Sequence, residues 1–100
     1  MSKNNAYIEE VEDFLGGTFH QDIQSPEQAM DEFILESTKE CLLDTINDCE
    51  KFLNSDIGKE EKENLIQNNA EIYFPAMNMN PIEWLTKLVK QMKMAVETKN

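Results

Sequence analysis

The residues best suited to chemistry in this sequence follow two adjacent glycines near the N-terminus. Phe19, His20 and Asp22 come within four positions of each other after Gly16-Gly17, and His20 is the only histidine. An imidazole near a carboxylate could transfer protons, but no serine or cysteine is placed beside His20 in sequence to form a nucleophile pair. A structural role is therefore favoured over a catalytic one, with Phe19 anchoring the turn on the core while His20, Gln21 or Asp22 bonds nearby backbone groups.

A helix on each side must position this turn. Before it, apolar residues recur at helical spacing and predict an amphipathic helix with Asn5 as its N-cap. This helix should end at Gly16-Gly17, because glycine readily adopts the positive φ of a helix end. After the turn, Ser25-Pro26-Glu27-Gln28 joins an N-cap serine to a proline at the first helical position. The apolar stripe of the first helix is Tyr7, Ile8, Val11, Phe14 and Leu15.

Three further helices are predicted. A break at Ser37-Thr38 separates the second helix from a third at residues 39–54, and a short charged helix should cover residues 59–69. Asn80-Pro81 repeats the pattern of a cap followed by proline, so it starts the last helix. Between these two helices, residues 72–75 predict an extended segment. The third helix should bury Leu42, Leu43, Ile46, Cys49, Phe52 and Leu53.

These elements predict an all-α fold, a compact bundle of about five helices. The whole chain, residues 1–100, is expected to form a single domain with short polar tails at residues 1–5 and 98–100. Trp84 falls on the same helix face as Leu88, which favours a place in the core over an exposed anchor. Met30 and Met92 also fall on core stripes, whereas Met77 and Met79 fit either a core or a methionine-rich groove for a partner.

The chain offers no pattern for a cofactor or a metal. Cys41 and Cys49 lie eight positions apart on the predicted third helix, about 12 Å along its axis, which is too far for a disulfide. Both should be reduced and at least partly buried, and neither has a second ligand at zinc spacing. Gly16-Gly17 stands alone rather than within a phosphate-binding loop, and no stretch has the ligand spacing of an EF-hand. We expect no enzyme activity and no small-molecule substrate.

Charge is the most informative bulk property. Twenty acidic residues against nine lysines give a net charge of −11, and arginine is absent. Up to Gly58 there are fourteen acidic residues and three lysines, whereas the remainder has six of each. Such a charge distribution disfavours binding to nucleic acid and favours a basic protein partner. A solvated face that only maintains solubility is the simpler alternative.

One acidic row opposes folding slightly. Glu40, Asp44 and Asp48 repeat at four-residue steps on the predicted third helix, where like charges cost a few tenths of a kcal/mol per pair. A binding function would explain why the row is present. The predicted partner-binding residues are Glu10, Asp13, Asp22, Asp31, Glu32, Glu36, Glu40, Asp44 and Asp48.

The segment from Phe14 to Asp22 also resembles a signature of the CdiI-type immunity proteins of bacterial contact-dependent growth inhibition. The matching positions are Phe14, Gly16, Phe19, His20 and Asp22, which we assign first to holding the turn. The family's next features, a Ser-Pro-Glu helix start, a tyrosine-containing extended segment and a Trp-Leu helix, correspond to Ser25-Pro26-Glu27, Tyr73-Phe74-Pro75 and Trp84-Leu85. The resemblance runs from about Tyr7 to Met92.

The resemblance implies a protein that binds and neutralises a cognate toxin, the C-terminal domain of a large surface-displayed exoprotein. Such toxins are commonly nucleases, with a ribonuclease favoured here, and a 1:1 complex in the cytoplasm is expected. No apolar run approaches the length of a membrane span, and residues 1–6 are too polar to begin a signal peptide. An acidic helical adaptor or regulatory domain that binds another basic protein is the alternative.

Overall fold

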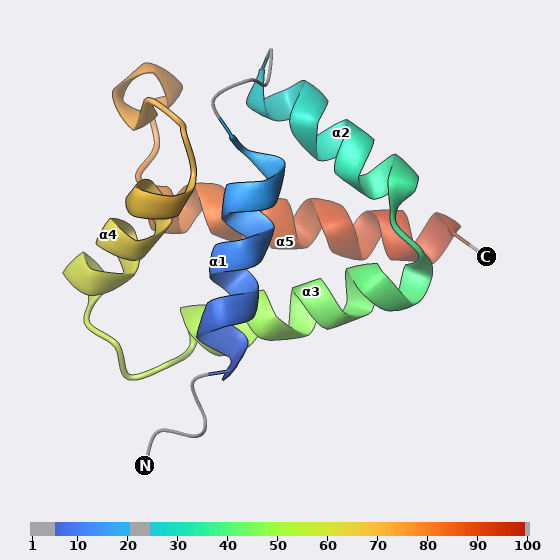
Figure 1. The fold of residues 1–100 in the computed structure, drawn as a ribbon, viewed down its shortest axis with the longest axis horizontal. Helices are drawn as coiled ribbons and strands as arrows, with labels where there is room; N and C mark the ends of the chain where they lie inside the picture. The colour runs from blue at the N-terminus through green and yellow to red at the C-terminus, as the bar shows by residue number, and fades with distance from the viewer. Residues whose placement is uncertain (1–5, 21–24, 100) are drawn as a thin grey trace.

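A computed structural model describes residues 6–20 and 25–99, and the regular structure in this part of the chain is helical (Figure 1). The predicted all-α bundle of five helices is therefore confirmed. The elements are α1 (Ala6–Thr18), α2 (Pro26–Glu36), α3 (Lys39–Leu53), α4 (Lys59–Asn69), the 3₁₀ helix η2 (Phe74–Met77) and α5 (Pro81–Thr98).

The bundle is built on the antiparallel pair α3 and α5 (Figure 1). Helix α1 crosses this pair and packs most extensively against α3, while α4 lies against α1 and α5. Helix α2 contacts α1 and α5 over a smaller area, at the end of the bundle where the C-terminus lies. As a result, α2 presents a broad outer surface to solvent.

The predicted helix starts are confirmed by their caps. The side-chain oxygens of Ser25 and Thr38 each accept a hydrogen bond from the backbone N–H three residues later, at 3.1 and 3.0 Å. At the start of α5, Asn80 Oδ1 accepts from the backbone N–H of Glu83 at 2.8 Å. Glu83 Oε1 accepts in return from the backbone N–H of Asn80 at 3.2 Å. This reciprocal capping box fixes where α5 begins.

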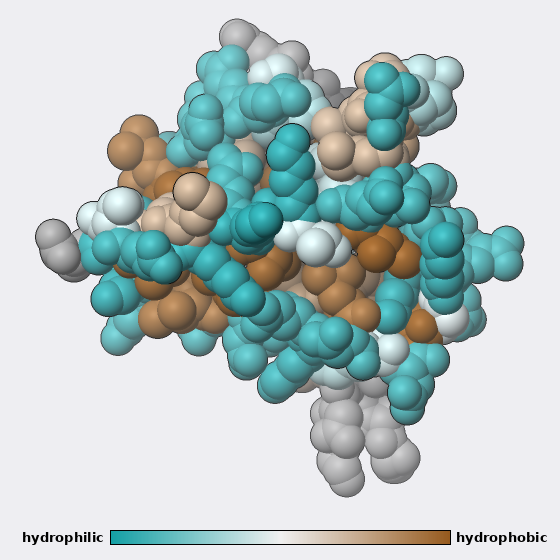
Figure 2. Space-filling view, turned by 180° about the vertical axis from the view of Figure 1, so that it is seen from behind, coloured by the Kyte–Doolittle hydropathy of each residue, from teal (hydrophilic) through white to brown (hydrophobic). Residues whose placement is uncertain are grey.

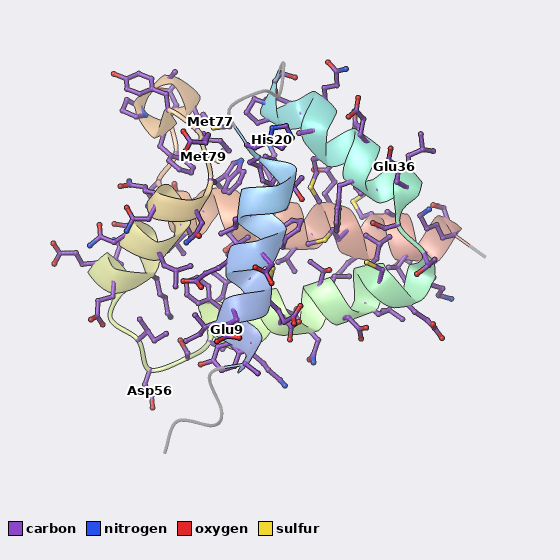
Figure 3. All side chains as sticks on the ribbon, viewed as in Figure 1. Glu9, His20, Glu36, Asp56, Met77 and Met79 are labelled. Carbon is purple, nitrogen blue, oxygen red and sulfur yellow. The ribbon has the colours of Figure 1, made fainter. Side chains whose placement is uncertain are left out.

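The core lies between α1, α3 and α5 and closes around Trp84, which is 3 % exposed. Met30 and Met92 are buried, as predicted. Met77 and Met79, labelled in Figure 3, are half-buried and line a small cavity of about 60 Å³ together with Trp84. Met77 and Met79, for which the sequence fitted either a core or a partner groove, therefore pack against the core.

The predicted end of the first helix is wrong. Helix α1 continues through Gly16-Gly17 to Thr18, and no glycine among the described residues has a positive φ. The physical reason is Phe19, which is fully buried and whose N–H still donates to the carbonyl of Leu15 at 2.9 Å. The helix thus runs one residue past Gly17, and this ring follows directly into the core.

Two residues of α3 are more exposed than predicted. Leu43 is 46 % exposed because it lies about 100° around the helix from its buried neighbour Leu42. Cys41 is also exposed, whereas Cys49 is fully buried, so only the second cysteine belongs to the core.

Two boundaries differ from prediction near the C-terminus. The predicted extended segment at residues 72–75 runs instead into η2, where Phe74 is buried and Pro75 fits the first turn of a helix. Thr98, predicted to belong to a tail, is the last residue of α5. Residues 1–5, including the predicted cap Asn5, and the turn residues Gln21 and Asp22 lie outside the described part of the chain.

Candidate functional site

An acidic groove lies between α1 and α3. It has a volume of about 370 Å³, and four of the nine predicted partner-binding residues line it. Among the described residues that form its walls, none is basic. The lining consists of Glu10 and Val11 from α1 and of Thr38, Glu40, Cys41, Asp44, Thr45, Asp48 and Cys49 from the cap and body of α3.

Helical spacing places these carboxylates together. Glu40, Asp44 and Asp48 are successive i, i+4 positions, so they follow one edge of α3. Glu10 comes from the crossing helix α1, next to Val11, which is fully buried. The buried side chains hold α1 and α3 together, and the acidic side chains line the groove between these two helices.

Within the groove, the position of Asp48 is unfavourable for a negative charge. The pKa of Asp48 is raised from its ordinary value of 3.8, first because burial removes water and also because Asp44 is nearby, while Lys51 acts in the opposite direction. Beneath it, burial raises the pKa of the Cys49 thiol to about 12, with Asp48 and Glu50 adding to the effect. A cation bound in the groove would relieve this accumulation of charge.

The aromatic residues of the Phe14–Asp22 segment connect α1 to the rest of the core. The rings of Phe14 and Phe19 meet edge to face with centroids 5.9 Å apart, and Phe14 also contacts Phe33 of α2 at 4.9 Å. The backbone carbonyl of Phe19 accepts a hydrogen bond from the N–H of Glu71 at 2.7 Å, which joins the end of α1 to the segment after α4. These contacts therefore help to set the angle at which α1 crosses α3.

A family model described as CdiI immunity protein matches residues 7–92, which include this segment and the groove. The chain belongs to the CdiI immunity protein family. The resemblance noted in the sequence is thereby confirmed. Membership implies an immunity protein that binds and neutralises a cognate toxin, a class that is generally not enzymatic. No curated protein matches the sequence, and no solved structure does.

In this CdiI immunity protein, the other predicted partner-binding residues lie outside the groove. Asp13 is exposed on α1. The three acidic residues of α2 that were predicted to bind are exposed as well, and Figure 3 shows Glu36 at the C-terminal end of that helix. The structure thus divides these residues into a groove set and an α2 set, the latter being Asp31, Glu32 and Glu36. Asp22 lies outside the described residues.

Sequence reasoning missed the polar side chains that share the groove with the carboxylates. Thr38 caps α3, and Thr45 donates a hydrogen bond from its hydroxyl to the carbonyl of Cys41 at 2.9 Å. The sequence contained a pattern that could have identified them. Positions 38, 41, 45 and 48 form a row along the helix, and this row meets the row of acidic residues at Asp48. The sequence does not show, however, that α1 packs along one side of this row.

Neither a metal site nor a membrane span is found in the part of the chain that the structure describes. Across residues 6–20 and 25–99, no three His, Cys, Asp or Glu side chains are grouped so that they could hold a metal ion. His20, labelled in Figure 3, is exposed just after α1. Over the same residues, no helix has both the length and the apolar character that a membrane span requires.

Proposed function

We propose that this immunity protein neutralises a basic toxin domain, a nuclease and specifically a ribonuclease, by binding it over the α1/α3 groove in a 1:1 complex in the cytoplasm. The observation that carries the proposal is the groove itself. Four acidic residues from two helices line it, and no described residue of its lining is basic. Glu10, Glu40, Asp44 and Asp48 are therefore the central contacts.

The charge of a nuclease is what this groove would complement. An enzyme that cleaves RNA or DNA holds phosphates with lysine and arginine side chains, so its active site attracts carboxylates. Complementary potentials speed association and fix the orientation of the partner. The acidic residues outside the groove, Asp13 and the α2 set, would add to this long-range attraction, and Asp22 is retained as a further candidate.

The geometry also supports a tight contact. Asp48 is half-buried before any partner binds, so part of the desolvation cost is already borne by the fold. A lysine or arginine placed beside Asp48 would pair with a charge that is partly shielded from water, where ion pairs are stronger than on an open surface.

The test measures binding of the cognate toxin domain to Asp44→Lys and Asp48→Lys variants at low and high salt. We expect each reversal to weaken binding by at least about tenfold at low salt, through slower association and faster dissociation, and the wild-type affinity to fall as salt rises. Glu60→Lys is the matched control, because Glu60 is an exposed carboxylate on α4, away from the groove. Inhibition of toxin nuclease activity should follow the same order.

The outcomes separate the candidate functions. Unchanged binding of both groove variants at both salt concentrations would contradict the proposed contact surface. A toxin that binds and is neutralised but cleaves neither RNA nor DNA would contradict only the nuclease assignment. Failure to bind the cognate toxin, together with capture of a different basic protein, would support the alternative of an acidic adaptor or regulatory domain.

A further inference from the structure

A second hollow lies between α3 and α5, on the face seen from behind in Figure 2, where hydrophobic surface shows between rows of hydrophilic side chains. Its volume is about 550 Å³, larger than that of the acidic groove. Leu53, Ile82 and Val89 supply apolar surface, of which Leu53 and Ile82 are half-buried. A hollow of this size is on the scale of a small-molecule pocket, so a single large apolar side chain of a partner would fill only part of it.

The rim of this hollow carries both signs of charge, unlike that of the groove, because Glu50 of α3 lines it together with two lysines. Lys90 and Lys93 stand on α5 at its edge, and the ammonium group of Lys93 pairs with the carboxylate of Glu50 on α3. Lys90 is exposed. An apolar side chain flanked by carboxylates is therefore the complementary partner chemistry.

The outer face of α2 has that chemistry. Leu35 is 78 % exposed, the largest exposed fraction of any large hydrophobic residue described. Asp31 and Glu32, both exposed, lie one helical turn before it and so flank it on the surface.

We propose that the chain associates with a second copy of itself, head to tail, with Leu35 of one copy seated in the α3/α5 hollow of the next. Asp31 and Glu32 would then face Lys90 of the neighbour, whose Lys93 is already paired with Glu50. The two surfaces differ, so the contact is heterologous, and repetition produces rings or open chains. This inference does not depend on the toxin.

The overall charge limits the strength of this contact. Two copies of net charge −11 repel each other, so a self-association that uses one apolar side chain should be weak. The hollow lies largely on α5, within the part of the sequence where acidic and basic residues balance. At physiological salt, charges farther apart than about 8 Å are largely screened, which leaves the local pairs dominant.

The first experiment is sedimentation velocity of the full chain, without toxin, at physiological salt over a wide range of concentration. The weight-average mass should rise with concentration, and Leu35→Asp should weaken the association by about tenfold or more. Because Leu35 is exposed, that variant should fold, which circular dichroism verifies. Tyr73→Asp is the control, since Tyr73 is 74 % exposed but lies on neither surface.

The second experiment identifies the contact by exchanging charges. Asp31→Lys alone and Lys90→Glu alone should each reduce self-association, because each brings like charges together. Mixing the two variants should restore association, since the two introduced charges then face each other as an opposite pair. In the same mixture, the unchanged Asp31 of one variant faces the unchanged Lys90 of the other. A monomer at every concentration would overturn the proposal, as would association that none of these substitutions changes.

Discussion

The ring of Phe19 packs edge-on against the indole of Trp84, with centroids 4.8 Å apart and ring planes at 71°. The indole also meets Phe74 at 5.3 Å. One tryptophan therefore joins the end of α1, the η2 segment and α5. The acidic groove depends on this contact indirectly, because the end of α1 must be held for α1 to cross α3 at the observed position.

Replacing Phe19 by alanine should destabilise the protein by about 3–5 kcal/mol, since a fully buried ring is lost and a cavity remains. Urea unfolding followed by the fluorescence of Trp84, the only tryptophan, measures the change. Tyr73→Ala removes an exposed aromatic ring instead and should cost less than about 0.5 kcal/mol. Equal effects of the two substitutions would show that the Phe19–Trp84 contact does not anchor the core.

Sequence patterns predicted that Phe19 and Trp84 would each lie in the core, but neither their contact nor the path of the chain between α1 and that contact. The spacing of apolar residues and the capping motifs are local signals, and the starts of α2, α3 and α5 were accordingly correct. The end of α1 was wrong because the conformational freedom of Gly16-Gly17 permits a helix end without requiring one. Burial of Phe19, a long-range contact, decided the outcome.

The candidate site was predictable in part for the same reason. The row of Glu40, Asp44 and Asp48 is local to one helix and is visible in sequence. The position of Glu10 beside that row depends on how α1 crosses α3, which no local pattern specifies. The α3/α5 hollow depends likewise on the packing of two helices, so no local pattern indicates it.

The two cysteines should differ sharply in reactivity. Cys41 is exposed in the groove, whereas Cys49 is fully buried and burial raises the pKa of its thiol to about 12, so this thiol stays protonated at pH 8. Iodoacetamide should therefore add one label per folded chain, at Cys41, and mass spectrometry of the digested protein locates it. Rapid labelling of both residues would contradict the burial of Cys49. The Cys41→Ser variant, which should remain unlabelled, is the control.

Bound toxin should protect Cys41 if it covers the groove as proposed. The labelling rate at Cys41 should then fall at least about tenfold in the complex, because a desolvated contact excludes the reagent. Toxin that binds with full affinity and leaves the rate unchanged would place the interface elsewhere on the molecule.

The capping box of α5 should contribute measurably to stability. Asn80→Ala removes the acceptor of the Glu83 N–H and should lower the free energy of unfolding by about 1 kcal/mol. Asn68→Ala, at an exposed position inside α4, should change stability by less than about 0.5 kcal/mol. Thermal unfolding of the two variants distinguishes them, and an equal loss in both would argue that the cap is not significant.

The acidic groove should make stability depend on pH. Because burial raises the pKa of Asp48 above 3.8, the folded protein holds a proton on this carboxyl more tightly than the unfolded chain does. Protonated Asp48 therefore stabilises the folded state at low pH. This stabilisation is lost as the pH rises through the pKa that Asp48 has in the folded protein. Ionised Asp48 thus opposes folding at neutral pH, and its repulsion from Asp44 is part of that effect.

Asp48→Asn should therefore stabilise the protein at neutral pH by about 0.3 kcal/mol or more, the size expected for removing one like-charge pair on a helix. The gain should disappear at acid pH below the ordinary pKa of 3.8, where wild-type Asp48 is protonated. Asp56→Asn removes the same charge from an exposed turn, labelled in Figure 3, and corrects for the overall charge of the chain. Urea unfolding at both pH values measures the difference. A stabilisation by Asp48→Asn that matches the Asp56 control, or that persists at acid pH, would show that the groove places no special cost on this carboxylate.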